Sequence, residues 1–363
     1  MSVFCGFSRS DIPETAIHET TKNIREAELI IYFSKVGYFK EITKLLSSKF
    51  KNSVVIGCSS SGEISKGGID YGLSIIAFSN HVEVKTLVIE NVKEAPIIYL
   101  KELREMSKNF NKTNTVALEM TDGLSNAEEK VLSVLSAVFE KQNIPVVGAS
   151  AADDLTFTKT YVACNGEVYT NASLVALIHN KNGKINIYKE NIYKPTKSGF
   201  VVTKSDFKER KVFELDNKPI AKVYAQALNV PESDISDYFM SNPIGRVIGD
   251  DISISSFRRV EKDNSISFYC RVYINSYVNI LEPEDPMVVL SNTISKVKNE
   301  MPSISGTIVI NCIFRTLLFK NKKLNSSFVS KLSNLGQFVG LTSYGEQFNN
   351  RHFNQTMLLI CFE

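Results

Sequence analysis

Hydrophobic and polar residues along this chain repeat one order of elements three times. An apolar run that predicts a strand is followed by a helix with one apolar face, by a strand that ends in a glycine loop, and by a further strand. The copies begin at residues 29–34, 115–120 and 307–314. Because a strand-helix-strand unit places its two strands parallel and the next strand can pair back antiparallel, the pattern predicts a mixed α/β fold with mixed sheets flanked by helices.

The helix of the second copy carries a start signal of its own. Ser125 precedes its apolar stripe, and Glu128 follows three residues later. This spacing predicts a capping box, in which the serine hydroxyl accepts a backbone N–H and the glutamate reaches back.

The glycine loops of the three copies align without a gap. They span residues 57–63, 148–154 and 340–346, and each has Gly first, Ser or Thr third and an acid last. Glycines and small hydroxyl residues at strand ends let a ligand approach main-chain N–H groups, which bind anionic groups such as carboxylates. The plain alternative is that these residues make tight turns, which is less convincing for three equivalent loops.

Catalytic interpretations of the first loop do not fit its context. Gly57 and Gly62 have the interval of a phosphate loop, but Glu63 follows in place of the lysine and a strand follows in place of the helix. A nucleophile elbow also requires a helix at this point. Cys58 has no histidine at a diagnostic spacing, and a buried thiol is its simpler role. We therefore expect binding, and no enzymatic activity.

Arg315 follows the first strand of the third copy in an apolar context. Its planar guanidinium suits a carboxylate, whereas the alternative is a buried ion pair with Glu346 or Asp154. An amino-acid-like ligand would use Arg315 for its carboxylate and the loop acids for its ammonium group.

The region between the second and third copies has a different pattern. Residues 191–199 predict a linker, and residues 214–228 predict a helix capped by Asp216 or Asn217. Apolar runs between residues 252 and 281 predict an antiparallel meander. We place a domain boundary near residue 190, giving domains 1–190 and 191–363.

Composition narrows the classes of partner. The 363 residues carry a formal charge of +3 with interleaved signs, which disfavours nucleic acid and acidic membranes as partners. Apolar runs have the length of strands, so we expect a cytoplasmic protein without a membrane span. The six cysteines occur singly, which argues against zinc or a disulfide scaffold.

Several of these segments together resemble the FIST family, over nearly the whole chain. The segments are IGCSSSGEI, PVVGASAADD and TYVACNGEVYTNASLVALI, then FELDNKPIAKVYAQAL, VINCIFRTLL, GLTSYGEQF and FNQTMLLICF. The resemblance implies FIST N-terminal and C-terminal domains, a pair found in bacterial signalling proteins and some F-box proteins. It also implies a sensory role in binding small ligands, with amino acids suggested.

The resemblance carries several positions of the C-terminal half over to this chain. They are Cys312, Arg315, Tyr344, Gly345, Glu346, Asn354, Gln355 and Thr356. In the family a His often stands directly before Asn-Gln-Thr, whereas this chain has Phe353 there and His352 one place earlier. A shift of one residue reverses the facing side in a strand, which puts a role for His352 in doubt.

Haem is an alternative ligand, because some members of the family are haem-binding nitric-oxide sensors. His81 and His179 follow or end equivalent apolar strands and are the axial candidates, although such positions more often are exposed strand ends.

We expect a non-enzymatic sensor that binds a small polar ligand between the two domains, where the loops converge, and passes the signal to a partner protein. The alternatives are a haem-binding nitric-oxide sensor, a scaffold or adaptor without a ligand, and an enzyme acting through Cys58 or Cys312. The candidate ligand-binding residues are Cys58, Ser59, Ser60, Ser61, Glu63, Ser150, Asp153, Asp154, Cys312, Arg315, Tyr344, Glu346, Asn354 and Gln355.

Overall fold

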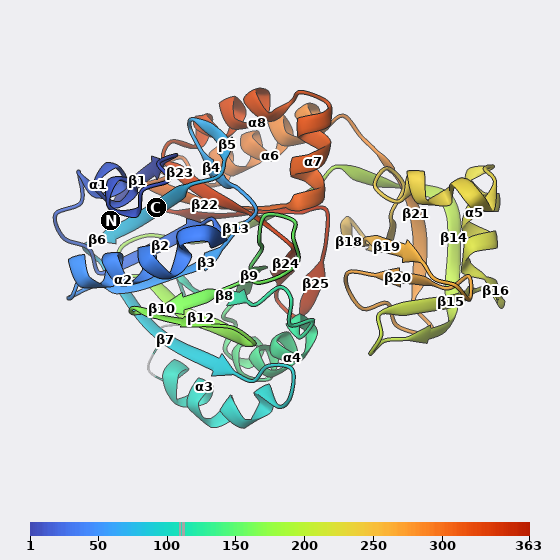
Figure 1. Ribbon diagram of the computed structural model, residues 1–363, viewed down its shortest axis with the longest axis horizontal. Helices are drawn as coiled ribbons and strands as arrows, with labels where there is room; N and C mark the ends of the chain where they lie inside the picture. Colours follow the sequence, from blue (N-terminus) through green and yellow to red (C-terminus); the bar gives the residue numbers. More distant parts are fainter. Residues whose placement is uncertain (109, 111–112) are drawn as a thin grey trace. The chain divides into compact units, whose positions relative to one another are not determined.

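The computed structural model describes residues 1–108, 110 and 113–363, and these form two compact units (Figure 1). The first unit comprises Met1–Glu190, Leu290–Arg351 and Met357–Glu363, and the second comprises Asn191–Val289 and His352–Thr356. The chain therefore leaves the first unit and returns to it. These compact units are a different division from the sequence domains 1–190 and 191–363, which stay a prediction.

The first unit supplies nearly all of three six-stranded sheets with one strand order. The first sheet runs β1 (Ser2–Ser8), β6 (Leu73–Ser79), β2 (Leu29–Ser34), β3 (Val54–Ser59), β10 (Val162–Cys164) and β11 (Glu167–Tyr169). The second runs β7 (Val82–Glu90), β12 (Ala172–Asn180), β8 (Thr115–Thr121), β9 (Val146–Ser150), β24 (Gly345–Phe348) and β25 (Arg351–Phe353). The third runs β13 (Ile185–Asn191), β26 (Thr356–Phe362), β22 (Gly306–Cys312), β23 (Phe338–Ser343), β4 (Glu63–Ser65) and β5 (Gly68–Asp70).

Each sheet has the pairing that the repeated pattern predicts. Its two middle strands are parallel, in the pairs β2 with β3, β8 with β9 and β22 with β23. The strand on the other side of the first member of each pair is antiparallel to it. The predicted mixed α/β architecture with three equivalent copies is confirmed.

The three copies exchange strands in a cycle. The hairpin after the first glycine loop, β4–β5, pairs with β23 of the third copy. The strand after the third loop, β24, pairs with β9 of the second copy, and the hairpin after the second loop, β10–β11, pairs with β3 of the first. Each sheet is therefore completed by a different copy.

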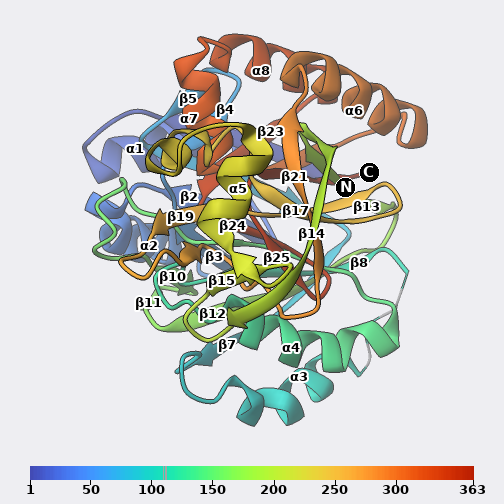
Figure 2. The same ribbon diagram turned by 90° about the vertical axis from the view of Figure 1, so that its right-hand side faces the viewer.

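Helices cover the sheets of the first unit. Helices α1 (Pro13–Thr21) and α2 (Phe39–Lys49) share a core with the first sheet, and α3 (Leu100–Ser107) and α4 (Glu128–Phe139) share one with the second. Both views place α3 and α4 side by side (Figure 1, Figure 2). Helix α7 (Ile313–Asn321) packs on β22 and β23 and is followed by α8 (Asn325–Leu332), whereas α6 (Pro286–Glu300) precedes β22.

Short 3-10 helices occur at five further places, η1 (Val36–Tyr38), η2 (Pro96–Tyr99), η3 (Glu140–Gln142), η4 (Glu232–Tyr238) and η5 (Ser333–Leu335), within the described part of the chain. None of the helices in that part combines the length and the apolar content that crossing a bilayer requires.

Two expectations about helix starts in the first unit were wrong. The first strand of the third copy ends at Cys312, and α7 begins at the next residue, so Arg315 lies in the first turn of a helix. The apolar run continues through this junction and hides it. No capping box opens α4, because the Ser125 hydroxyl accepts from the nearby N–H of Ala127 and the Glu128 carboxylate accepts from Ser150.

The second unit is built on an eight-stranded antiparallel sheet with α5 (Ile220–Leu228) packed against it. Its strands are β14 (Tyr193–Asp206), β15 (Lys211–Leu215), β16 (Lys218–Pro219), β17 (Ile244–Ile248), β18 (Asp251–Ser255), β19 (Phe257–Val260), β20 (Ile266–Phe268) and β21 (Tyr277–Pro283). The antiparallel arrangement predicted for this region is confirmed.

Two local predictions in the second unit were wrong. Most of the expected linker 191–199 belongs to the first half of β14. A register shift between Pro195 and Gly199 accommodates the proline. Asp216 and Asn217 do not cap α5. They have φ angles of 48° and 61° and form the turn between β15 and β16, as left-handed Asp and Asn residues often do in hairpins.

Candidate functional site

The three glycine loops form a closed ring inside the first unit. We number the positions of each loop one to seven, from Gly57, Gly148 and Gly340. In every case the N–H of position five donates to the carbonyl of position three in another loop. The three bonds are Ser61 N to Thr342 O at 3.0 Å, Tyr344 N to Ser150 O at 3.1 Å, and Ala152 N to Ser59 O at 2.9 Å.

This glycine-loop ring accounts for part of the repeated pattern. The backbone groups at positions three and five are used between the loops, so the common loop shape has a structural reason. The Ser59 hydroxyl also accepts a backbone bond, from Tyr161 N at 2.9 Å. The Ser61 hydroxyl is buried and has no partner within the described residues.

The glycine at position one is required by packing between strands. A Cβ atom at Gly57 would lie 2.4 Å from the carbonyl oxygen of Tyr32. A Cβ atom at Gly148 would lie 2.3 Å from the carbonyl oxygen of Glu119, and one at Gly340 would lie 2.1 Å from the carbonyl oxygen of Val309. Any side chain there would force the parallel strands apart.

The acids at position seven of the first and third loops are held alike. The Glu63 carboxylate accepts from the Ser60 hydroxyl and from Gly72 N, each at 2.5 Å. The Glu346 carboxylate accepts from the Ser343 hydroxyl, also three residues earlier, at 2.7 Å. Burial raises the pKa of Glu63 to about 8, against the opposing effect of its hydrogen bonds with Ser60 and Gly72.

The second loop departs from this arrangement. Asp153, at position six, is buried, whereas Asp154 at position seven is exposed and bonds to Thr156. The Asp153 carboxylate accepts the backbone N–H groups of residues 157, 158 and 159, at 2.8 to 3.2 Å, and the hydroxyl of Tyr344. The ring of Phe157 stacks on Tyr344 with centroids 5.0 Å apart.

The Asp153 and Tyr344 pair links the second and third loops. Burial alone would raise the pKa of Asp153, but the bonds from Tyr344 and the three N–H groups lower it below its usual value. Burial raises the pKa of Tyr344, and the neighbouring Asp153 raises it further. The phenol therefore keeps its proton and donates a hydrogen bond to a charged carboxylate.

Arg315 forms a buried ion pair, as the alternative interpretation of the sequence expected, but with a different partner. Its Nη2 lies 2.6 Å from Oε1 of Glu190, and the two side chains are 1% and 2% exposed. Its Nε donates to Oδ1 of Asn311 at 2.9 Å. Glu190, near the end of β13, lies 125 residues away in the chain, and no spacing in the sequence links the two.

The Arg315–Glu190 pair retains unused hydrogen-bonding capacity. Nη1 of Arg315 and Oε2 of Glu190 are both buried and without a partner in the part of the chain that the structure describes. Such atoms are uncommon in folded proteins, because an unsatisfied buried polar group costs free energy. The guanidinium of Arg315 thus offers one unused donor group, and the carboxylate of Glu190 offers one unused acceptor atom.

The pair is connected to the glycine-loop ring. The side-chain amide of Asn311, which holds Arg315, donates to the hydroxyl of Thr316 at 2.9 Å. The Thr316 and Thr342 hydroxyls lie 3.2 Å apart, and Thr342 occupies position three of the third loop.

The two cysteines singled out in the sequence are fully buried. Cys58 lies on β3, and Cys312 is the last residue of β22. Burial raises the pKa of the Cys58 thiol, and the neighbouring Glu119 and Glu63 add to this effect. A thiol held in its protonated form is a poor nucleophile.

Asn354 and Gln355 belong to the second unit, whereas the ring lies in the first. Oδ1 of Asn354 accepts the N–H of Ser256 at 3.2 Å, and Nε2 of Gln355 donates to the hydroxyl of the same serine at 3.0 Å. Both residues thus hold the segment before β19.

The two candidate haem ligands lie at strand ends. His81 is exposed in a turn with a φ of 69°, and Nδ1 of His179 shares a hydrogen bond with the Thr115 hydroxyl at 3.0 Å. Neither observation favours an axial haem ligand.

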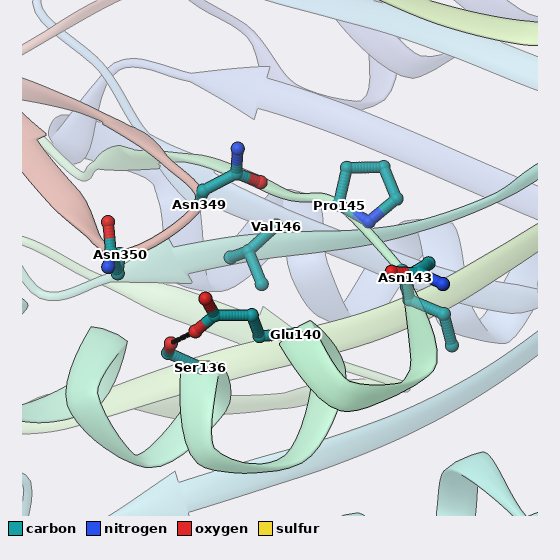
Figure 3. A pocket seen from close by; sticks show the side chains of 8 residues that line it. Ser136, Glu140, Asn143, Pro145, Val146, Asn349 and Asn350 are labelled. Atoms are coloured by element: carbon teal, nitrogen blue, oxygen red, sulfur yellow. Dashed lines mark hydrogen bonds between the residues drawn. The ribbon is translucent and has the colours of Figure 1, made fainter.

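A surface pocket of about 410 Å³ lies at the C-terminal end of α4 (Figure 3). Ser136, Glu140 and Asn143 line it together with Asn349 and Asn350, and the Ser136 hydroxyl donates to Glu140 at 2.7 Å. None of the candidate residues from the sequence lines this pocket.

Comparison with known proteins gives two family matches and one relative. Residues 28–218 match the FIST N domain, and residues 221–349 match the FIST C domain. An uncharacterized protein of Methanocaldococcus jannaschii is 23% identical over 333 residues, which cover 84% of this chain and 63% of that protein. The chain thus spans less than two thirds of the length of this relative. The glycine-loop ring takes two loops from the first matched segment and one from the second.

Proposed function

The chain belongs to the FIST family, whose domains are proposed sensory modules, and we propose that it senses a small polar ligand recognised by the Arg315–Glu190 pair. The ligand class is a compound with a carboxylate and an ammonium group, such as an amino acid. Occupancy would be passed on to a partner protein.

One observation carries this proposal. The buried ion pair leaves Nη1 of Arg315 and Oε2 of Glu190 unpartnered, and these atoms offer one donor beside a positive charge and one acceptor beside a negative charge. A carboxylate would accept from the guanidinium, and an ammonium group would donate to the glutamate. An amino acid supplies both groups within one small molecule.

The hydrogen bonds from Asn311 through Thr316 to Thr342 support a sensory role for this position. A ligand that moves Arg315 would displace the residues that hold the third glycine loop. Because that loop bonds to the other two, the disturbance would extend to loops from both matched family segments.

A thermal-shift screen of amino acids and related metabolites tests the proposal. A ligand at one hundred times its Kd should stabilise the protein by about 2.7 kcal/mol. Arg315→Lys keeps the charge but removes the planar fork, and Glu190→Gln keeps the shape but removes the acid, so each should weaken binding at least about tenfold and lower this stabilisation to about 1.4 kcal/mol or less.

Arg259→Lys is the matched control, because Arg259 forms an ion pair with Glu261 in which the arginine side chain is 64% exposed. This variant should respond as the wild type does. A hit that stabilises Arg315→Lys and Glu190→Gln as strongly as the wild type would place the site elsewhere, and the absence of any hit would favour a scaffold.

A further inference from the structure

One row of residues crosses four neighbouring strands in each sheet of the first unit, through the glycine at loop position one. Residues directly opposite each other in a sheet share a face, so each row lies on one side. The rows are Ile75-Tyr32-Gly57-Ala163 in the first sheet, Val175-Glu119-Gly148-Gln347 in the second, and Leu359-Val309-Gly340-Ile64 in the third.

The second sheet breaks the pattern of the other two. Beside the glycine, the first and third sheets place Tyr32 with Ala163 and Val309 with Ile64, all of them buried in the core. The second sheet places a carboxylate and an amide there, and both Glu119 and Gln347 are 0% exposed. Because the other two sheets place no charged group at this position, the costly burial of Glu119 calls for a reason outside the sheet geometry.

Other oxygen-bearing side chains surround this row. Oε2 of Glu119 accepts from the hydroxyls of Thr121 at 2.7 Å and Ser173 at 3.2 Å. On the other side of the glycine, Nε2 of Gln347 donates to the Ser150 hydroxyl at 2.8 Å.

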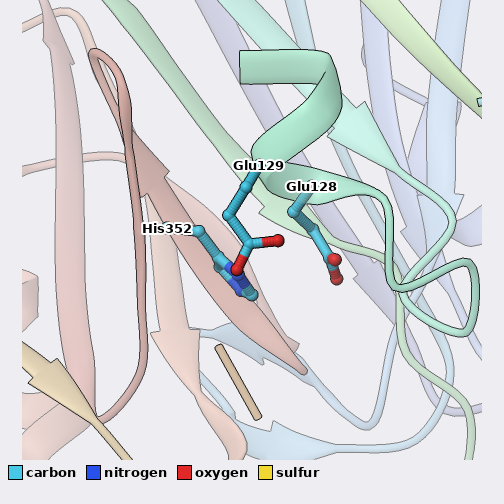
Figure 4. Close-up of side chains that lie close together, drawn as sticks. All are labelled: Glu128, Glu129 and His352. Atoms are coloured by element: carbon cyan, nitrogen blue, oxygen red, sulfur yellow. The ribbon is translucent and has the colours of Figure 1, made fainter. Parts of the chain in front are cut away.

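Ser150 in turn brings in a second carboxylate. Its hydroxyl donates at 3.0 Å to Oε1 of Glu128. Figure 4 shows Glu128 in the first turn of α4. Glu128 is 2% exposed. Thus a second buried glutamate, from a different element, is connected to Gln347 through Ser150.

Two acceptor atoms in this cluster have no donor. Oε1 of Glu119 and Oε1 of Gln347 are buried and unpartnered within the described residues. Gly148 lies between these two residues on the same face of the sheet and has no side chain, and Cγ of Glu119 leans to within 2.5 Å of the place where a Cβ of Gly148 would be. Burial raises the pKa of Glu119 to about 8; the nearby Glu128 acts in the same direction, and the hydrogen bonds from Thr121 and Ser173 act against it.

The geometry points to a buried site for one small divalent cation, Mg²⁺ or Ca²⁺, between Glu119 and Gln347 above Gly148. Carboxylate and amide oxygens are the ligands that these hard cations prefer. Glu128 supplies the second negative charge. This site shares no residue with the Arg315–Glu190 pair, which lies between α7 and β13.

Titration of the full-length protein with each metal alone tests the site. After treatment with EDTA and dialysis, calorimetry should find one Mg²⁺ or Ca²⁺ bound per chain, and the Tm should rise with the metal. The double variant Glu119→Val/Gln347→Ile copies the row of the third sheet. It should bind the metal at least about tenfold more weakly, and its metal-free Tm should equal or exceed that of the wild type.

Two further variants keep the result unambiguous. Glu119→Gln preserves volume and should lose the metal even if the double variant folds poorly, whereas Glu102→Gln, at an exposed position on α3, should bind as the wild type does. A wild type that binds neither metal, with an unchanged Tm, would overturn the proposal and leave the two oxygens to a proton or a water molecule. Equal binding by wild type and double variant would overturn it as well.

Discussion

The glycine at loop position one shows how a single residue can be repeated for a reason other than ligand binding. Its three occurrences lie where a Cβ atom would meet the carbonyl oxygen of the adjacent parallel strand. The sequence alignment found these glycines and predicted an approach by a ligand. The close approach is made by the protein's own backbone.

Gly340→Ala should therefore destabilise the protein by about 1–3 kcal/mol, the usual cost of overpacking a core. The Cβ atom would lie 2.1 Å from the carbonyl oxygen of Val309. Urea unfolding followed by circular dichroism measures the change. Gly37→Ala is the control, because nothing lies within 4 Å of its Cβ position. Equal stability of the two variants would contradict the packing explanation.

Glu63 should make stability depend on pH. Its folded-state pKa is about 8 against 4.5 when unperturbed, so between these values the folded chain holds a proton that the unfolded chain has released. Its contribution to the free energy of unfolding therefore falls as pH rises, by up to about 1.4 kcal/mol per pH unit.

Glu63→Gln removes this titration. Unfolding measured between pH 5 and 8 should show a shallower decline in the variant than in the wild type. Parallel declines in the two proteins would mean that Glu63 titrates normally in the folded state.

At the scale of elements, hydrophobic periodicity predicted most strands and helices of the three copies, because each buries one face. The prediction failed where a local feature of the sequence allowed a second interpretation. The apolar run through Cys312 concealed the change from β22 to α7, and Asp216 with Asn217 suits a hairpin turn as well as a helix cap. The alignment placed Glu63 and Glu346 at equivalent positions, and in the structure each accepts from a serine hydroxyl three residues earlier. Glu190 was missed because its contact with Arg315 depends on which strand lies at the sheet edge.

The segment from Asp154 to Lys159 should depend on the Tyr344 hydroxyl. In Tyr344→Phe the ring still stacks on Phe157, but the Asp153 carboxylate loses the hydrogen bond that the tyrosine hydroxyl donates. The same carboxylate accepts three backbone N–H groups. A bond to a charged group typically contributes about 1.5–3 kcal/mol. Hydrogen exchange at residues 157–159 should accelerate, while exchange in β22 stays unchanged. Unaltered protection at residues 157–159 would show that the hydroxyl does not hold this segment.

At the scale of the whole chain, the repeat was visible in the sequence, but the exchange of strands between copies was not. A sequence pattern can predict that two strands form a hairpin, but it does not determine which other strand lies beside that hairpin in the sheet. The pairing of β4 with β23, of β24 with β9 and of β10 with β3 closes the cycle. The two matched family segments therefore share one core in the first unit.

A fragment of residues 1–218, which ends with the first matched segment, should not fold cooperatively. It lacks β22, β23, β24 and β26, so β4 loses β23, β9 loses β24 and the glycine-loop ring loses its third member. Thermal unfolding and limited proteolysis of the fragment check this. A sharp transition with native-like protection would contradict the shared core.

If the Arg315–Glu190 pair recognises a small polar ligand, a substitution of Arg315 should change the Kd of the strongest hit from the metabolite screen. We predict that Arg315→Lys weakens binding at least about tenfold, as expected for loss of about 1.4 kcal/mol or more, while Arg259→Lys leaves it unchanged. Equal Kd values for wild type and Arg315→Lys would show that Arg315 does not recognise the ligand.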